Sequence, residues 1–571
     1  MKPVRLPASA TLALPRWGLI SLCLLYILPG LIRRDPWKTD DVAGFGIMWT
    51  MAHGSLQDWL LPNIAGMPMP EEGPLAFWIG ALCIKLFSWV MDEALAARIS
   101  TILFFLIGAL AVWYATYLLG RRSEAQPLRL AFGGQPEARD YGRTLADGAL
   151  LIYLGCLGLL LRSHETSAEA LQVSLVAVSL YGAVRLFDSG SRRGAATLGI
   201  TLGLMALTRG FVLPLALALA LLLVAILAER QVLRRLLLAS FPLALAIVAA
   251  WLLTLHFFAK APSAALHTWL RWNLDQVSGP TAATLVYLVR NAFWYAWPAW
   301  PFAAWAVYAW RKQSPTLHTR LPLVILAATV VLALANRHSE DSVLLPLLPP
   351  LAILAAFGLP TMKRGAINAV DWFSVMTLTT CAAFIWIGWI AKQTGWPPQL
   401  SRNALRLAPG FTPEFNLLAF LIAACASAAW IWLVHWRIAR RPSVLWRAVV
   451  LSSGGVILCW LLLMTLWLPW LNYGKSYAGV ARQVAGKLPQ QYCVDSNVGP
   501  AQRASFAYFG HVNFARAHQD QCQFLLLQDS LSRRNSRQLL EAYGGDWKLL
   551  WEGRRPSDRD ERFRLYQRNP S

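Results

Sequence analysis

The chain has 571 residues, of which 56% are hydrophobic and 14% are charged. Soluble globular proteins carry roughly 25% charged residues, so this composition excludes an ordinary soluble domain and indicates a polytopic membrane protein. The formal net charge of +22 would suggest nucleic-acid binding in a soluble chain. In a membrane protein it is better explained by Lys and Arg in cytoplasmic loops and near anionic lipid, so no nucleic-acid partner is expected.

Apolar runs long enough to cross a membrane, about 18 residues or more, recur along residues 1–473. Loops rich in Lys and Arg alternate with loops that are not, and the basic loops belong on the cytoplasmic side. These basic loops lie at residues 121–143, 185–193, 230–235 and 311–312. The alternation predicts an all-α membrane domain of about thirteen spans, with a cytoplasmic N-terminus and the C-terminus outside. Residues 74–91 are apolar but begin at a proline, and we expect them to lie in the outer leaflet.

Charge first gathers beside the membrane directly after the first apolar run, from Arg33 to Asp41. A segment rich in Trp and Met follows, and then a loop from Pro62 to Leu75. We interpret residues 33–93 as a loop outside the membrane that carries the chemistry, with amphipathic helices. The rest of residues 1–473 then serves as its scaffold.

Residues 474–571 are polar and alternate between helical and extended patterns, which predicts a small α/β domain on the outer side. Cys493 and Cys522 both lie there. Cysteines outside the membrane can oxidise, so we expect a disulfide between them, with two free thiols as the alternative. The other six cysteines lie in apolar stretches and are expected to act as small hydrophobes. No Cys/His spacing predicts a zinc site.

Acidic residues at the outer membrane surface are candidate catalytic groups. Asp40 and Asp41 stand where a helix would begin, so a helix cap is one reading and a general base is the other. Glu165 and Glu169 begin the span after the second outer loop. They are either solvated helix ends or a second acidic group of the same site.

Several basic residues fall on the outer side, where the charge rule disfavours them. Arg209 ends an apolar span, and its planar guanidinium suits a phosphate. A structural arginine whose head reaches the membrane surface is the alternative. Binding of an anionic lipid head group is the simplest explanation for these basic residues on the outer side. Besides Arg209, the residues that we expect to bind it are Arg34, Lys85, Arg162 and Arg271.

Four segments carry recognisable motifs. Residues 34–41 read Arg-Asp-Pro-Trp-Lys-Thr-Asp-Asp, and residues 71–78 read Glu-Glu-Gly-Pro-Leu-Ala-Phe-Trp. Residues 203–210 read Gly-Leu-Met-Ala-Leu-Thr-Arg-Gly, and residues 344–352 read Leu-Leu-Pro-Leu-Leu-Pro-Pro-Leu-Ala. In this order they resemble motifs of the aminoarabinose transferase and protein mannosyltransferase superfamily. These are GT-C type glycosyltransferases that use polyprenyl-phosphate sugars.

The resemblance implies a GT-C fold of thirteen spans with an outward, periplasmic C-terminal domain, in a bacterial inner membrane. It places Asp40 at the catalytic aspartate of the family, Asp41 at the acid beside it and Arg209 at a lysine. Two positions depart from the family pattern. A lysine that helps to bind the lipid phosphate is Glu72 here, and Ser167 stands where the second outer loop usually has an acid.

The sequence therefore predicts a membrane glycosyltransferase with Asp40, Asp41 and Glu165 as catalytic residues. The resemblance implies an undecaprenyl-phosphate sugar as donor and a lipid A, glycan or protein acceptor, with membrane lipid around a monomer. No cofactor is predicted, and a divalent metal stays open. The alternative is a flippase or transporter of lipid-linked sugars without catalysis. It predicts ionisable residues deep within the spans, whereas charge here collects at their ends.

Overall fold

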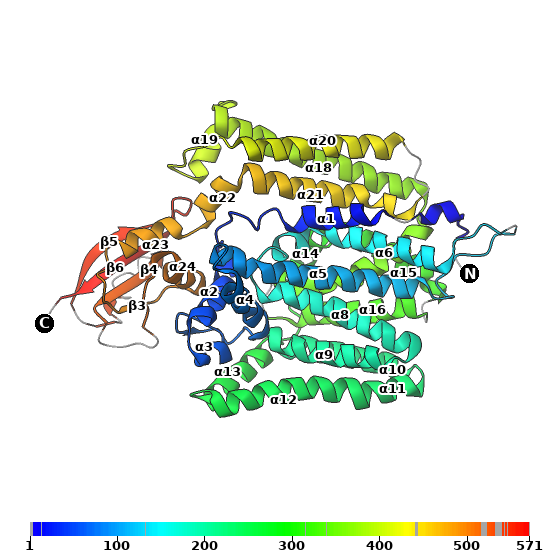
Figure 1. Cartoon of the computed structure of the whole chain (residues 1–571), viewed down its shortest axis with the longest axis horizontal. Helices are drawn as coiled ribbons and strands as arrows, with labels where there is room; N and C mark the ends of the chain where they lie inside the picture. The colour runs from blue at the N-terminus through cyan, green and yellow to red at the C-terminus, as the bar shows by residue number, and fades with distance from the viewer. Residues whose placement is uncertain are drawn as a thin grey trace.

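The structure is a computed structural model that describes residues 4–569, except 13, 132, 314–315, 338–339, 440–443, 516–521, 531–539, 542 and 545. It has two parts, a bundle of long helices lying side by side and a smaller domain with a sheet at one end of the bundle (Figure 1). The two chain termini lie at opposite ends of the molecule (Figure 1).

The bundle is built from mostly apolar helices, which satisfy their own backbone hydrogen bonds and so need no water. These helices are α1 (Arg16–Ile27), α5 (Glu93–Gly120), α6 (Ala138–Gly155), α8 (Ala168–Ser189), α9 (Arg192–Arg209), α10 (Val212–Ile226), α12 (Phe241–Phe258), α15 (Ala299–Trp310), α16 (Leu317–Ala335), α17 (Leu348–Gly358), α18 (Arg364–Thr394), α20 (Leu417–Ala439) and α21 (Val450–Leu466). Helices α8 and α17 are mostly buried, whereas α12, α18 and α20 expose apolar side chains over most of their length. The chain is thus a multi-pass membrane protein whose outer helices face lipid.

Eight helices of the described residues are long and apolar enough to cross a membrane, or nine if the bent pair α21 and α22 (Leu468–Lys475) is one span. The count of about thirteen spans therefore stays a prediction.

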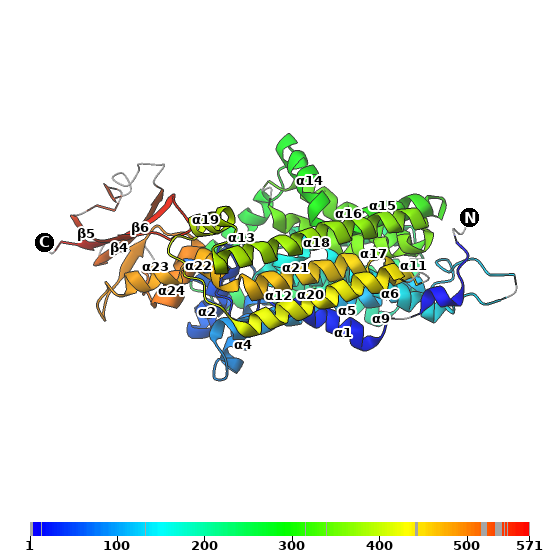
Figure 2. The ribbon, with the colours of Figure 1, turned by 90° about the horizontal axis from the view of Figure 1, so that it is seen from above.

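Two of the long apolar runs are broken into separate helices. The apolar run at 144–161, which is long enough for one span, is divided at Cys156 into α6 and α7 (Leu157–Arg162), and the apolar run at 284–310 is divided between α14 (Ala282–Tyr295) and α15. Figure 2 shows α14 standing out from the side of the bundle.

Short helices gather at the end of the bundle that carries the sheet domain (Figure 1). They include α2 (Asp40–His53), α3 (Leu56–Leu60), α4 (Leu75–Phe87), α13 (Pro262–Asp275) and α19 (Pro398–Leu407). A two-stranded hairpin, β1 (Asn63–Ile64) and β2 (Met67–Pro68), lies between α3 and α4. Residues expected in the outer leaflet form α4, which buries Ala76 and Phe77 and exposes Leu82 and Leu86. Further short helices include α11 (Arg230–Arg235), in a basic loop, and the 3₁₀ turn η4 (Asp341–Leu347).

The C-terminal part is a small α/β domain, as the sequence predicts. Its sheet has the order β3 (Val494–Ser496), β4 (Phe524–Ser530), β6 (Glu561–Arg568) and β5 (Trp547–Gly553). Strands β3 and β4 are parallel, and the other pairs are antiparallel. Helices α23 (Ala478–Ala485) and α24 (Pro500–Gly510) pack on a core that includes Tyr477, Phe506 and Phe563. Cys493 and Cys522 form a disulfide.

The C-terminal domain packs directly on residues 33–93. The guanidinium of Arg503 donates hydrogen bonds to the backbone oxygens of Ile64 (3.1 Å) and Ala65 (2.8 Å). Helices α2 and α24 touch where Gly46 faces Ala504, because a Cβ at Gly46 would lie 2.4 Å from the Cβ of Ala504. Residues 33–93, which we predict to carry the catalytic residues, and the C-terminal domain therefore lie at the same end of the bundle.

The opposite end of the bundle holds the N-terminal segment and the first basic loop. The amide of Leu128 donates to the backbone oxygen of Val4, and that of Ala8 donates to the backbone oxygen of Gly134. The beginning of the chain and the C-terminal domain thus lie at opposite ends, in agreement with an odd number of crossings. Which end faces the periplasm stays a prediction.

Candidate active site

Asp40 and Asp41 occupy the first turn of α2, where carboxylates favour the positive end of the helix dipole. The helix is held close to the turn before α8, because a Cβ at Gly44 would lie 1.9 Å from the backbone oxygen of Thr166. Only a residue without a side chain fits there. The two acids therefore stand next to the polar segment at residues 162–169, but they face different surroundings.

Asp41 is buried, and its carboxylate is saturated with donors. Oδ2 accepts from Nη2 of Arg34 (2.6 Å), Nη2 of Arg98 (3.3 Å) and the amide of Trp37 (3.1 Å). Oδ1 accepts from the amide (2.9 Å) and the hydroxyl (3.0 Å) of Thr166. These partners outweigh the effect of burial and hold the pKa of Asp41 well below its ordinary value. The geometry gives Asp41 an anchoring role and does not support the catalytic role predicted for it.

Asp40, by contrast, keeps 46% of its side chain exposed. Its carboxylate accepts from Nη1 of Arg162, which also donates to Oε2 of Glu165 at 2.9 Å. Burial raises the pKa of Glu165 to about 7, although Arg162 opposes the shift. Arg162 therefore links the two predicted catalytic acids, of which Asp40 faces open space and Glu165 is enclosed.

A second ion pair joins Arg209, at the end of α9, to Oε1 of Glu169 in the first turn of α8. Glu169 and Ser167 are each only 4% exposed. Oε2 of Glu169 and Oγ of Ser167 are buried without a hydrogen-bond partner among the described residues. Native proteins satisfy nearly all such groups, so these two atoms are available to a ligand.

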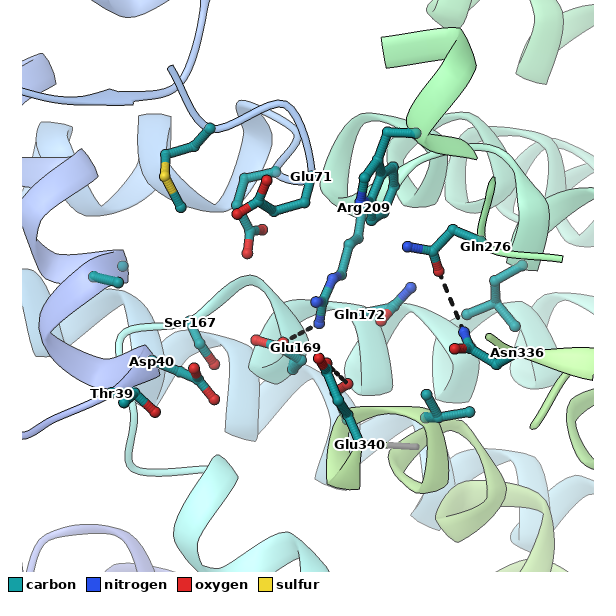
Figure 3. A pocket seen from close by; sticks show the side chains of 18 of the residues that line it. Thr39, Asp40, Glu71, Ser167, Glu169, Gln172, Arg209, Gln276, Asn336 and Glu340 are labelled. Carbon is teal, nitrogen blue, oxygen red and sulfur yellow. Dashed lines mark hydrogen bonds and ion pairs between the residues drawn. The ribbon is translucent and has the colours of Figure 1, made fainter. Parts of the chain in front are cut away.

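Asp40, Ser167, Glu169 and Arg209 line one cavity of about 450 Å³ (Figure 3). Figure 3 shows the Arg209 side chain extending across it toward Glu169, with Glu340 on the same side. The acids along the lining are Asp40, Glu71, Glu72, Glu169 and Glu340, and Arg209 is the one basic residue in its described part. Part of the wall is apolar, from α10 and α16, through Val212, Leu213 and Leu332.

The C-terminal domain supplies another part of the wall. Pro500, Ala501 and Gln502, in the first turn of α24, line the cavity. Gln502 is held in place by the hydroxyl of Tyr477 (3.1 Å) and by Oε1 of Glu561 (2.9 Å), both of which accept from its amide. The cavity is therefore completed by residues far apart in the sequence.

Three predicted lipid-binding residues lie outside this cavity. Arg34 is buried against Asp41 and stacks on Trp37, with its Cζ 4.6 Å from the ring centroid. Lys85 is exposed, with its ammonium 5.8 Å from the centroid of the Trp59 ring. Arg271 is 76% exposed along its side chain and lies 3.9 Å from Asp275. The structure thus brings only Arg209 to the cavity and places Arg162 one contact away, on Asp40.

Sequence reasoning missed several lining residues, namely Glu71, Gln172, Gln276, Asn336, Glu340 and Gln502. In the cavity the amide of Asn336 donates to Oε1 of Gln276 at 3.3 Å, and the hydroxyl of Ser342 donates to Glu340 at 3.4 Å. The available signal was their place in predicted outer loops or at span ends. In the described part of the chain, no three His, Cys, Asp or Glu side chains are grouped in a way that could hold a metal ion.

The bundle, the short helices at its end and the C-terminal domain together have the GT-C type fold. The structure of ArnT from Cupriavidus metallidurans bound to undecaprenyl phosphate is similar to this chain with a TM-score of 0.68 and 14% sequence identity, over 96% of this chain and 97% of that one. The apo state of the same protein gives a TM-score of 0.66 at 14% identity, over the same shares.

A third structure has a lower score. It is the archaeal oligosaccharyltransferase AglB from Archaeoglobus fulgidus, in complex with an inhibitory peptide and a dolichol-phosphate. Its TM-score is 0.46 at 11% identity, over 90% of this chain and 69% of that one. No protein-family model matches the chain, and no curated protein matches its sequence.

Proposed function

We propose that the chain is a membrane glycosyltransferase that moves a sugar from a polyprenyl phosphate to an acceptor at the periplasmic face of a bacterial inner membrane. Undecaprenyl phosphate is the carrier that we propose, and lipid A, a glycan or a protein is the acceptor. The proposal rests on one observation: Asp40 and Arg209 line the same cavity. Additional support comes from the fold shared with ArnT, which was solved with undecaprenyl phosphate bound.

The cavity lies where a lipid-linked donor and a polar acceptor could meet. Its apolar wall comes from membrane helices α10 and α16, and its polar wall comes from α2, α8 and the C-terminal domain. An isoprenoid chain would occupy the apolar side, next to the bilayer, and the sugar and phosphate the polar side.

In the transfer step, the bond from the anomeric carbon to the phosphate oxygen breaks, and its electron pair goes to that oxygen. The departing phosphate is a stable anion and needs no proton, but it needs cationic stabilisation, which Arg209 supplies. An acceptor hydroxyl forms the new bond to the anomeric carbon and gives its proton to the carboxylate of Asp40. If the acceptor is itself a phosphate, Asp40 orients it instead of accepting a proton.

The direct test is mass spectrometry of lipid A and surface glycans from cells that lack the gene, complemented with the wild-type protein or with Asp40→Asn. We expect the wild-type protein, but not the variant, to restore one glycan species. A flippase would move its lipid without a base, so full restoration by a stably expressed Asp40→Asn protein would favour the transporter.

Orientation has its own test, because the location of the reaction depends on it. Reporter fusions after Arg122, Arg193 and Arg235 should report the cytoplasm, since these residues end or occupy basic loops. Fusions after Asp40 and after the C-terminus should report the periplasm. A cytoplasmic C-terminus would contradict the odd number of spans.

A further inference from the structure

Glu72 is held next to Arg209 by its own backbone. The amide of Gly73 donates to the backbone oxygen of Thr208 at 3.0 Å. A Cβ at Gly73 would lie 2.1 Å from the backbone oxygen of Leu207, so this turn packs tightly on the last residues of α9. Those are the residues that lead into Arg209. The position of Glu72 in the cavity is therefore set by the fold and not by a flexible loop.

One oxygen of the Glu72 carboxyl group has no hydrogen-bond partner among the described residues. This atom, Oε2, is buried, while Arg209 is already bonded to Glu169. Burial raises the pKa of Glu72 to about 8; Arg209 opposes the shift, and Glu169, Glu71 and Asp40 add to it. Burial therefore favours the neutral acid form of Glu72, which has a hydrogen to donate.

The ionised and the protonated forms of Glu72 would have opposite effects on the binding of an anionic phosphate. An ionised Glu72 would repel it, whereas the acid form donates an O–H···O hydrogen bond to an anionic oxygen, which is among the stronger kinds. Of the other acids in the lining, Glu169 is paired with Arg209 and Asp40 with Arg162, whereas Glu71 and Glu340 add negative charge. The acid form of Glu72 therefore removes one repulsive charge beside Arg209 and supplies a hydrogen-bond donor in its place.

We propose that Glu72, as a neutral carboxylic acid, donates a hydrogen bond to the phosphate of the polyprenyl carrier beside Arg209. Phosphate binding is then coupled to one proton on Glu72. This inference rests on the proposed function and deepens it, because it gives the acidic cavity a way to accept an anion. The resembling family has a charged lysine at this position, and here a neutral donor takes its place.

The test measures the affinity of the full-length protein in detergent for undecaprenyl phosphate from pH 7 to 9.5, at constant ionic strength. A phosphate monoester has its second pKa near 6, so its charge is almost constant over this range. We expect the wild-type Kd to rise above pH 8, approaching about tenfold per pH unit. Glu72→Gln keeps an N–H donor that does not titrate, so its Kd should stay constant. Glu93→Gln, at an acid outside the cavity lining, should keep the wild-type slope.

Three results would overturn the inference. These are a wild-type affinity that does not change with pH, a Glu72→Gln protein that keeps the wild-type slope, and a Glu72→Gln protein that binds more tightly at pH 7. Glu72→Met, neutral without a donor, should bind about tenfold more weakly at pH 7. The wild-type profile decides the matter even where a variant fails to fold. If the wild-type protein binds no undecaprenyl phosphate at any pH, the carrier in the proposed function is wrong.

Discussion

Two ionic clusters lie side by side at the same end of the bundle, and they differ in what they leave unbonded. The first, centred on Asp41, contains Arg34, Arg98 and Thr166, and five donors occupy its carboxylate. The second, centred on Arg209 and Glu169, leaves carboxylate and hydroxyl atoms without partners and opens on a cavity. Similar residue types therefore build an anchor in one place and a binding site in the other.

The adjacent acids of α2 make the contrast sharp, because they share a helix, a turn and a residue type. Asp41 is 1% exposed, and Asp40 keeps 46% of its side chain exposed. A saturated buried carboxylate stabilises the fold and has no capacity for a proton or a ligand. An exposed one with a single arginine partner keeps that capacity. The same substitution at the two positions should consequently separate stability from activity.

Asp41→Asn should have the largest effect, and it should act on stability. The change leaves the guanidinium groups of Arg34 and Arg98 buried without a compensating charge, which costs about 3–5 kcal/mol. We expect a large fall in the thermal unfolding temperature in detergent and a low yield of folded protein. A variant as stable as the wild-type protein would show that this cluster is not the anchor.

Asp40→Asn should leave unfolding almost unchanged, because the side chain is half exposed and Arg162 keeps its ion pair with Glu165. Turnover should fall by about 10²-fold or more, since the amide cannot accept the acceptor's proton. The measurement is transfer rate together with unfolding temperature on the same preparation. Full activity in a stable protein would exclude Asp40 as the general base.

Arg209→Ala should weaken use of the lipid donor by about 1.5–3 kcal/mol, the value of a charge-assisted hydrogen bond to an anion. It also leaves Glu169 without its cation, so unfolding is measured in parallel. Arg209→Lys should recover much of the loss, because it restores the charge. Equal donor KM values for the wild-type and Arg209→Ala proteins would exclude contact with the phosphate.

The smallest effect concerns the pH dependence of stability, to which Glu165 and Asp41 contribute with opposite signs. The raised pKa of Glu165, about 7 against an ordinary 4.5, means that the folded state holds a proton that the unfolded chain has lost. Its contribution to the free energy of unfolding therefore falls as pH rises from about 4.5 to 7. Asp41 has a lowered pKa, so its contribution is present above its ordinary value of 3.8 and is lost as pH falls below it.

Glu165→Gln removes the first of these contributions. Its unfolding temperature should vary less between pH 5 and 7 than that of the wild-type protein, by a few degrees at most. Glu414→Gln, at an exposed acid, serves as the control and should follow the wild-type profile. If both variants show the same profile, Glu165 titrates as it would in water.

The sequence predicted the architecture and part of the site, and the limits have physical causes. Loop charge and hydropathy predicted the membrane bundle and the α/β tail, because both depend on local composition. They also placed Asp40 and Arg209 on one surface. The breaks after α6 and α14 escaped prediction, since apolar runs look continuous through them. The anchoring role of Asp41 depends on hydrogen bonds from Arg98 and Thr166, which lie 57 and 125 positions away in the sequence. Nothing in the sequence pairs such distant groups.

The wall that α24 contributes to the cavity has a consequence for the order of synthesis. The segment with Asp40 emerges from the ribosome early, and Pro500, Ala501 and Gln502 emerge only after nearly the whole chain. The bundle can therefore be inserted and packed while the cavity still lacks one side. A nascent chain that meets lipid-linked sugars in the membrane holds its reactive groups in an unfinished pocket, and a helix that is synthesised late completes it.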